Sequence, residues 1–352
     1  MAVYTQIDNP ELYFQVKAFS GTGSSNAVTL DGDTDMQPDL VWIKNRTAAE
    51  EHRIHDAVRG ANKLLRSNGD YAEATTSQDV MSFNSDGFTV GTESAVNASG
   101  QNIASWNWKA GTSFTNDASA TGIGSIDSSG SVNETAGFSI VSYTGSGSAA
   151  TVKHGLSTTP NMMIIKNRVT ASKDWQVYSP VNDPTDALAL NQTDATGDSN
   201  VYWNDTAPTS SVFSVHSGAT NTSGAATIGY IFSERQGYSK FGRYIGNANA
   251  DGPFIYTGFK PAMVILKLSS VAGENWYIFD NKRDTDNVMT QILYPNLGNA
   301  EATGTTNIDF LSNGFKLRNA GDFLNGSGRT NIYACFAENP FVNSNGVPCN
   351  AR

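Results

Sequence analysis

A proline followed by an apolar run and a lysine occurs three times in this sequence, and it constrains the fold more than any other feature. The run is PDLVWIKNR from Pro38, PNMMIIKNR from Pro160 and, in a shortened form, PAMVILK from Pro261. Proline has no N–H to give to a sheet, so it suits the first residue of a strand. An uninterrupted apolar run of this length is typical of a strand buried on both faces. The sequence therefore predicts three related copies of one buried strand, repeated at the scale of whole domains.

A second pattern recurs in the same three repeats, at a constant distance from an aromatic residue. It is an asparagine, two further residues and a glycine, with the aromatic residue eight positions after the glycine. Asn and Gly are turn formers, so the pattern predicts a turn before a buried strand in each repeat. The copies are Asn97 to Gly100 with Trp108, Asn221 to Gly224 with Phe232, and Asn325 to Gly328 with Phe336.

The stretch 51–66 allows two interpretations. Taken alone, its apolar residues follow a helical spacing. The corresponding stretches 174–178 and 275–279 are DWQVY and NWYIF, which favour strands. Because the repeats should share one fold, we expect a strand over residues 51–58 and leave residues 60–66 open.

Each repeat holds roughly seven expected strands with turns every 8 to 12 residues, a spacing typical of antiparallel sandwiches. We therefore predict an all-β fold of three tandem antiparallel β-sandwich domains, jelly-roll-like and related by internal duplication. The predicted parts are an N-terminal arm (1–15), three repeats (16–111, 137–235 and 236–342), a Ser/Gly/Thr-rich linker with a minor hairpin (112–136) and an exposed C-terminal tail (343–352).

Composition excludes several classes of partner. The net charge is −10 and Lys and Arg are not clustered, whereas nucleic acids and anionic membranes require a basic surface. No apolar run approaches the ~18 to 20 residues of a transmembrane helix. The first residues lack the basic and apolar segments of a secretory leader. We expect neither nucleic-acid binding nor membrane insertion.

Catalytic, cofactor and metal motifs are not evident. Asp31 to Asp35 alternates carboxylates as a calcium loop does, but Met36 and Trp42 stand where an EF-hand needs Gly and Glu, which favours a solvated turn. His52 and His55 occupy strand positions that are aromatic in the other repeats, which favours packing. The two cysteines form no CxxC pair. The sequence predicts no catalytic residue, no cofactor and no metal site.

Two sets of residues are candidates for a site. The first is a charged pair: Asp56 and Arg59 recur as Asp280 and Arg283, a spacing that favours ion pairs fixing a loop, with sugar binding as the alternative.

The second set is a short aromatic and polar stretch. Tyr202, Trp203, Asn204 and Asp205 place two aromatic and two polar side chains together, as a glycan site requires. The alternative is that Trp203 packs in the core or between domains.

The chain also resembles tail-fibre-like virion proteins of marine tailed bacteriophages, a family of repeated domains of unknown function. The resemblance covers nearly the whole chain and implies a particle component assembled in the bacterial host cytoplasm and exposed on the virion surface. It carries no catalytic residues over to this sequence. The matching phrases are VWIKNR from Val41, GFSIVSYTG from Gly137, WNDTAPTSSVF from Trp203, QGYSKFG from Gln236 and FAENPF from Phe336.

Three roles remain open at this point. The first is a short tail fibre or receptor-binding adhesin that contacts host-surface polysaccharide. The second is a capsid decoration or head-fibre protein, and the third is a polysaccharide depolymerase. We expect a non-enzymatic protein that attaches to other virion proteins through residues 1–15. We also expect a homotrimer, both from the resemblance and because strands that are apolar on both faces need cover beyond one sandwich.

Overall fold

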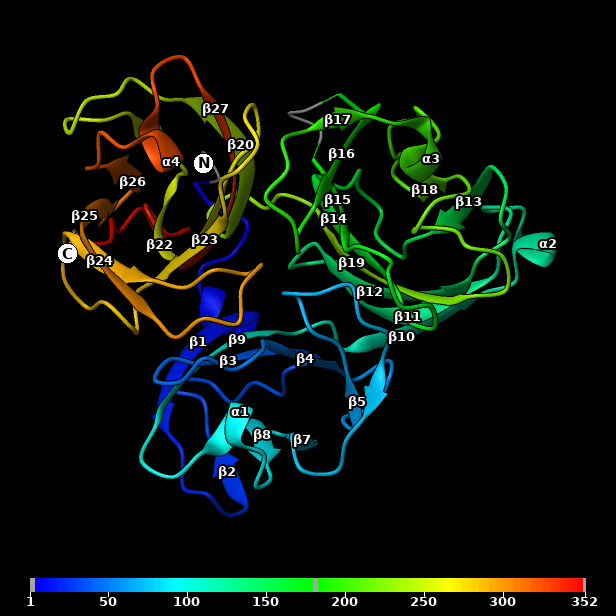
Figure 1. The fold of residues 1–352 in the computed structure, drawn as a ribbon, viewed down its shortest axis with the longest axis horizontal. Coiled ribbons are helices and arrows are strands. Elements are labelled where there is room, and N and C mark those ends of the chain that lie inside the picture. The colour runs from blue at the N-terminus through cyan, green and yellow to red at the C-terminus, as the bar shows by residue number, and fades with distance from the viewer. Residues whose placement is uncertain (1–3, 180–182, 351–352) are drawn as a thin grey trace.

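The structure is a computed structural model that describes residues 4–179 and 183–350. It is all-β, as the sequence predicts, and its α-helices are single turns. Three lobes surround a common centre (Figure 1). We call them lobe 1 (residues 14–108), lobe 2 (residues 112–232) and lobe 3 (residues 239–340).

Lobe 1 contains an inner and an outer sheet. Its elements are η1 (Pro10–Leu12), β1 (Phe14–Ser20), β2 (Asn26–Val28), β3 (Leu40–Asn45), β4 (Arg53–Asp56), β5 (Lys63–Leu64), β6 (Ala74–Thr75), β7 (Val80–Asn84), β8 (Gly87–Val90), α1 (Ser94–Asn97) and β9 (Asn102–Trp108). The inner sheet has the strand order β1-β9-β3-β4 and the outer sheet has the order β2-β8-β7, while β5 pairs with β6.

Lobe 2 has a wider inner sheet. Its elements are β10 (Thr112–Asn116), α2 (Ala118–Thr121), β11 (Ser128–Asn133), β12 (Phe138–Thr144), β13 (Ala150–Lys153), β14 (Met162–Asn167), β15 (Gln176–Tyr178), β16 (Asp186–Ala189), β17 (Gly197–Asp198), α3 (Asn200–Trp203), β18 (Val212–Val215) and β19 (Ala226–Phe232). The inner sheet has the order β10-β11-β12-β19-β14-β15-β16-β17, and β13 and β18 form the outer layer.

Lobe 3 has two four-stranded sheets. Its elements are β20 (Ser239–Ile245), β21 (Phe254–Tyr256), β22 (Phe259–Leu268), β23 (Trp276–Asp280), β24 (Met289–Ile292), β25 (Ala302–Leu311), β26 (Gly314–Leu317), α4 (Asp322–Asn325) and β27 (Thr330–Pro340). The inner order is β20-β27-β22-β23 and the outer order is β21-β26-β25-β24. The orders β1-β9-β3-β4, β12-β19-β14-β15 and β20-β27-β22-β23 therefore correspond strand by strand.

The three proline-led runs form β3, β14 and β22, and each is buried on both faces. Successive side chains of a strand point to opposite faces. Leu40 and Trp42 of β3 lie in a central core that all three lobes share, whereas Val41 and Ile43 lie in the core between the two sheets of lobe 1. The second cover that the sequence requires is thus supplied within one chain. The matching central residues are Met162, Ile164, Met263 and Ile265, and the matching lobe-core residues are Met163, Ile165, Val264 and Leu266.

The strand predicted over residues 51–58 is confirmed, because β4 pairs with β3 there. The helical interpretation of this stretch is wrong. All four residues of β4 pair with β3, so contacts with a strand distant in sequence override the local helical spacing. Part of residues 60–66, which the prediction left open, forms the short strand β5.

Residues 112–136, expected to be a linker, are mostly structured. β10 and β11 pair with each other, and β11 pairs with β12, so this stretch extends the inner sheet of lobe 2. Small and polar residues suffice here because β10 is the edge strand and needs little apolar cover. The sequence predicted only a minor hairpin around Ile126 and Val132, whereas the structure has two strands that continue the inner sheet.

The recurring asparagine explains the Asn-x-x-Gly pattern. The side chain of Asn97 is fully buried, its Oδ1 accepts the N–H of Thr22, and its Nδ2 donates to the carbonyl oxygen of Gly91. It thereby holds the connection between β1 and β2. Asn221 accepts the N–H of Ser146 in the same way, at 2.7 Å. The predicted turns are confirmed, and the asparagine also fixes a second turn distant in sequence.

The two described ends of the chain pack against the body. Thr5 is buried and its Oγ1 donates to the carbonyl oxygen of Gln236, while Ile7 joins the central core. At the other end, Ser344 donates to the carboxylate of Asp8. Residues 4–13 therefore lie along lobe 3 rather than extending from lobe 1 as a separate arm.

Candidate functional site

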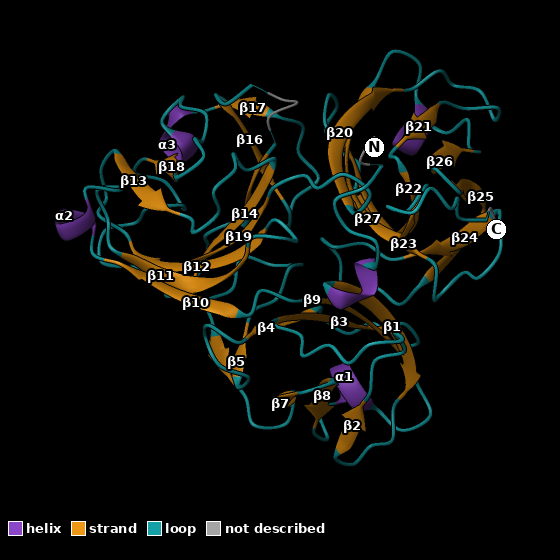
Figure 2. Cartoon of the chain, turned by 180° about the vertical axis from the view of Figure 1, so that it is seen from behind, coloured by secondary structure: helices purple, strands orange, loops and turns teal. Residues whose placement is uncertain are grey.

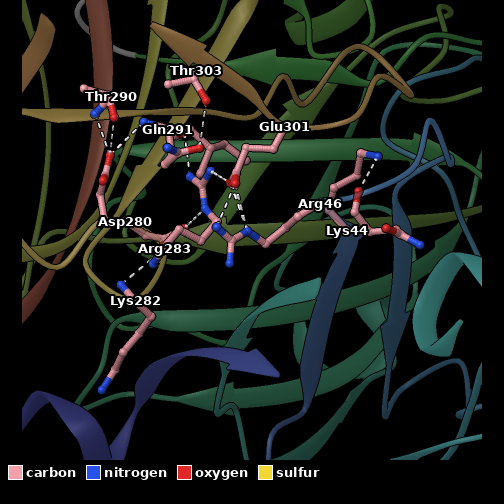
Figure 3. A network of polar contacts seen from close by, with 12 residues as sticks. Lys44, Arg46, Asp280, Lys282, Arg283, Thr290, Gln291, Glu301 and Thr303 are labelled. Carbon is pink, nitrogen blue, oxygen red and sulfur yellow. Dashed lines mark hydrogen bonds and ion pairs between the residues drawn. The ribbon is translucent and has the colours of Figure 1, made fainter. Parts of the chain in front are cut away.

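A polar network joins lobe 3 to lobe 1 and contains one predicted pair (Figure 3). Asp280, the last residue of β23, accepts from Arg283 Nε at 2.5 Å, and both side chains are fully buried. Arg283 Nη1 then reaches Glu301 Oε1 at 2.7 Å, and Glu301 Oε2 accepts from Arg46 Nη2 at 2.7 Å. Trp106 Nε1 donates to the same aspartate, at Oδ2, over 3.0 Å. Four charged groups and one indole thus connect the two lobes.

A corresponding network joins lobe 1 to lobe 2. Asp56 and Arg59 are fully buried and 2.5 Å apart, Arg59 Nη1 lies 3.1 Å from Glu73 Oε2, and Glu73 accepts from Arg168 Nε at 2.8 Å. Tyr230 Oη donates to Asp56 Oδ2 at 2.7 Å, in the place of the Trp106 indole. We call these contacts between lobes seams.

The pKa shifts of Arg59, Arg283 and Glu73 all favour the charged form of the side chain. Burial alone would lower the pKa of Arg59 and of Arg283, but the charges of Asp56 and Asp280 more than offset burial and raise both. Burial alone would raise the pKa of Glu73, yet its bonds with Arg168 and Arg59 lower that pKa. The seams therefore contain paired charges.

The third seam, between lobes 2 and 3, has neutral residues at the matching positions. In the two charged seams, the backbone N–H of Glu73 donates to the carbonyl oxygen of Arg168, and that of Glu301 donates to the carbonyl oxygen of Arg46, both at 2.8 Å. The N–H of Thr196 donates to the carbonyl oxygen of Ser269 at the same distance. Thr196 Oγ1 adds a 2.7 Å bond to that oxygen. The three seams thus share a backbone contact and differ in charge.

The predicted ion pairs are confirmed, but they do not sit in exposed loops. Each arginine and aspartate has 0% side-chain exposure, and Arg283 Nη2 also donates to the carbonyl oxygen of Ile278. A sugar in solution cannot reach them, so the sugar-binding alternative for Asp56, Arg59, Asp280 and Arg283 is wrong. Their hydrogen-bonding capacity is directed to neighbouring backbone and to the next lobe.

The glutamates of the seams were not found from the sequence. A signal was present in the pattern of substitutions between repeats. Repeats one and two end their buried run in Lys-Asn-Arg, whereas repeat three has Ser269 at the arginine position. Repeats one and three carry Asp-x-x-Arg, whereas repeat two has Ser179 at the aspartate position. The arginines that end the first two runs, Arg46 and Arg168, each contact a repeat that keeps Asp-x-x-Arg. The pattern of substitutions therefore indicates that the lobes contact one another in a cyclic order.

The lysines that end the three runs form a second set of contacts missed from the sequence. Lys44, Lys166 and Lys267 are fully buried, and burial lowers the pKa of each to about 8. Lys44 Nζ donates to the carbonyl oxygen of Gly298 across the seam at 3.1 Å, and Lys267 Nζ donates to that of Thr193 at 3.2 Å. Lys44 and Lys267 therefore hold loops of the neighbouring lobe, whereas Lys166 Nζ donates to the carbonyl oxygen of Lys173 in its own lobe.

Trp203 does not form the exposed aromatic surface that its sequence context suggested. Its side chain is 0% exposed and packs edge-on against Tyr178, 5.6 Å between ring centroids, in the core of lobe 2. The prediction of a Trp203 glycan contact is therefore wrong, and the alternative, that Trp203 packs in the core, is confirmed. The cause is α3, which turns Trp203 inward and leaves Asn204 and Asp205 at the helix end with positive φ.

Tyr202 is separated from Trp203 by the same helical turn. It is partly buried and lines a polar groove of about 240 Å³, together with Asp174, Gln176 and Asp198. Asp174 already accepts from Asn191 and Gln192 at 2.7 and 3.0 Å. Of the four predicted glycan residues, Tyr202 is the one that the groove includes.

His52 and His55 act as packing residues, as expected. His52 Nδ1 accepts from Trp42 Nε1 at 2.8 Å, and His52 Nε2 contacts the carbonyl oxygen of Tyr294 in lobe 3 at 2.9 Å. Burial keeps the pKa of both histidines below its ordinary value. Across the described ranges, no three His, Cys, Asp or Glu side chains are grouped so that they could hold a metal ion.

These observations define the class. The chain is an all-β protein of three lobes in which the predicted charged residues form buried ion pairs at the contacts between lobes. Among residues 4–179 and 183–350, no helix has the length and apolar character needed to cross a membrane. The chain belongs to the family described as a domain of unknown function, DUF7483, whose model matches residues 9–340. No curated protein matches the sequence.

Proposed function

We propose that this chain is a non-enzymatic structural protein on the surface of a bacteriophage virion, acting as a short tail fibre or receptor-binding adhesin. One observation carries the structural part of this proposal. The buried charges of two seams, from Asp56 to Arg168 and from Asp280 to Arg46, all bind other parts of the same chain. Such pairs stabilise a fixed arrangement of lobes, which a particle component needs. The resemblance to tail-fibre-like virion proteins supports the location.

The proposal includes internal duplication of a jelly-roll-like sandwich. Support comes from the matching orders of the inner sheets and from the backbone contact common to the seams, formed by Glu73, Thr196 and Glu301. The matched roles of Asn97, Asn221 and Asn325 provide further support, since each joins the same two turns of its repeat. A single ancestral sandwich copied twice accounts for all of these correspondences.

One of the two reasons for expecting a homotrimer does not apply to this structure. The expectation rested on the resemblance and on strands that are apolar on both faces, and β3, β14 and β22 receive both covers within one chain. We therefore propose that one chain already forms the threefold body, and that attachment to other virion proteins sets its copy number.

The location on intact particles tests the role. Gold-labelled antibody against the purified chain, viewed by electron microscopy, should mark the tail. Label confined to the head would replace the adhesin with the decoration or head-fibre role. Particles that carry no label, and no peptide of this chain by mass spectrometry, would overturn the virion proposal.

Catalysis is tested on the purified chain. Incubation with host-surface polysaccharide should release no reducing ends above a heat-treated control. Release that depends on folded protein would replace this proposal with the depolymerase role.

A further inference from the structure

An exposed aromatic pair lies on the outer sheet of lobe 3. Phe254 and Tyr256 are 46% and 57% exposed, and the residue between them, Ile255, is buried in the lobe core. Alternate residues of a strand share a face, about 6.6 to 6.8 Å apart along it. The two rings therefore stand side by side on β21, which Figure 2 shows at the outer rim of lobe 3, away from the other lobes.

Glycines leave room for both rings to lie along the sheet surface. Gly314 stands opposite Tyr256 in the register, and a Cβ added to it would come within 3.2 Å of Phe254 Cε2. A Cβ added to Gly258 would lie 3.6 to 3.8 Å from the Tyr256 ring. The Phe254 ring thus lies near Gly314 and the Tyr256 ring near Gly258, where the backbone carries no side chain, and we call this pair of rings the platform.

The platform is particular to lobe 3. In the outer layers, buried Ile255 stands opposite Phe315, just as Val28 stands opposite Phe88 and Val152 opposite Phe213. The residues that flank these buried positions on the outer face are Phe254 and Tyr256 in lobe 3, Ala27 and Thr29 in lobe 1, and Thr151 and Lys153 in lobe 2. Core packing is satisfied in all three lobes, so it does not require aromatic rings at the flanking positions.

Charged side chains border the platform in balanced pairs. Lys316, opposite Phe254, contacts Asp251 at 2.9 Å, and Arg318 contacts Asp309 at 2.7 Å. Cations whose charge is already compensated offer little attraction to an anionic ligand. The border therefore suits a neutral ligand with hydroxyl groups, which charged side chains can still bind by hydrogen bonds.

We infer that Phe254 and Tyr256 form a binding platform for a neutral polysaccharide. Sugar rings offer apolar C–H faces edged by hydroxyl groups, and aromatic rings bind the C–H faces while the polar border binds the hydroxyls. Two rings give far less than the ~800 Å² per partner of a stable protein interface. β21 is a three-residue edge strand preceded by Pro253, features that oppose strand addition by a second chain.

The inference rests on the proposed adhesin role and names the ligand class for it. Affinity electrophoresis of the purified chain in gels containing dextran, mannan, agarose or alginate tests it without the particle. Retardation is expected in at least one of the three neutral gels. We expect Phe254→Ala and Tyr256→Ala each to weaken binding by about tenfold, because each removes one stacked ring. Near-UV circular dichroism and the melting temperature of each variant establish that it is folded.

Matched controls separate the platform from other aromatic sites. Tyr71→Ala removes another exposed tyrosine, 47% exposed in lobe 1, and should leave retardation unchanged. A loss with Tyr202→Ala instead would place the sugar in the lobe 2 groove and overturn the inference. So would retardation in alginate alone, no retardation in any gel, or self-association that the Phe254→Ala variant abolishes. The particle-labelling experiment is independent, so the two proposals fail separately.

Discussion

Arg46 and Glu301 stand 255 positions apart in the sequence and form a two-pronged ion pair across a seam, with Nη2 and Oε2 2.7 Å apart. Glu301 simultaneously binds Arg283, which is fully buried. One carboxylate therefore neutralises two cations that belong to different lobes. The stability of the arrangement of lobes 1 and 3 depends on a residue that no local pattern distinguishes.

Replacing that carboxylate should destabilise the whole chain. We expect Glu301→Ala to lower the free energy of unfolding by about 3 kcal/mol, because it leaves a buried arginine without part of its compensation. Chemical denaturation followed by fluorescence measures the change. Asp322→Ala is the control, since the Asp322–Arg329 pair is largely exposed and should contribute little. Equal effects of the two variants would contradict the structural role of the seam.

The neutral seam should open more often than the charged seams. The backbone N–H groups of Glu73, Thr196 and Glu301 make the same 2.8 Å bond across their seams, so their hydrogen exchange can be compared directly. Local opening exposes an amide to exchange, and ion pairs on either side raise the cost of opening. Exchange at Thr196 should be the fastest of the three after correction for intrinsic rates. Slower exchange at Thr196 than at Glu73 would refute this order.

Trp203→Ala should act on stability. The indole is fully buried, so its removal leaves a cavity and is expected to cost about 3 to 5 kcal/mol. Thermal unfolding followed by circular dichroism measures the loss. Tyr71→Ala, at an exposed position, should shift the melting temperature little. A variant at Trp203 that melts like the parent would mean that the indole is not packed in the core of lobe 2.

Stability should fall as the solution becomes acidic. Burial lowers the pKa of His55 to about 3 and that of His154 to about 4, below the value of about 6.5 for an unfolded chain. Between these values the unfolded state binds more protons, so the stabilisation present above pH 6.5 is lost as pH falls. Each histidine should account for about 2 kcal/mol of unfolding free energy between pH 6.5 and 5.

The histidine effect must be separated from carboxylates of opposite sign. Burial raises the pKa of Asp39 and Asp79, which favours the folded state at lower pH. Urea denaturation of the parent and of His55→Gln at several pH values isolates the histidine, because both proteins share the carboxylates. A difference between them that does not change with pH would contradict the buried, neutral state of His55.

The strands were predictable where their signals are local. Proline followed by an apolar run located β3 and β14. The Asn-x-x-Gly turns located the strands that follow those turns, β9, β19 and β27. β10 and β11 were missed because their composition is that of a linker, and their pairing with β12 is what makes them strands. The assembly of lobes was not predictable, since it depends on contacts between residues hundreds of positions apart.

The features of the candidate site that depend on local spacing were also predictable, and those that depend on distant contacts were not. The Asp56–Arg59 and Asp280–Arg283 pairs follow from a spacing of three residues and were predicted. Their burial was not, because the surrounding cover comes from Tyr230 and Trp106 of neighbouring lobes. Trp203 failed for a related reason: polar neighbours in the sequence suggest exposure, while a single helical turn directs the indole inward.

The alternation of side chains along β3, β14 and β22 has a consequence for how the chain folds. Half of the apolar residues of each strand lie in a core that exists only when all three lobes are together. A lobe produced alone would expose that face to water, at a cost of roughly 25 cal/mol for each Å² of apolar surface. Folding is therefore expected to be cooperative over the whole polypeptide, with one unfolding transition for all three lobes. We expect no fragment smaller than the three lobes together to fold.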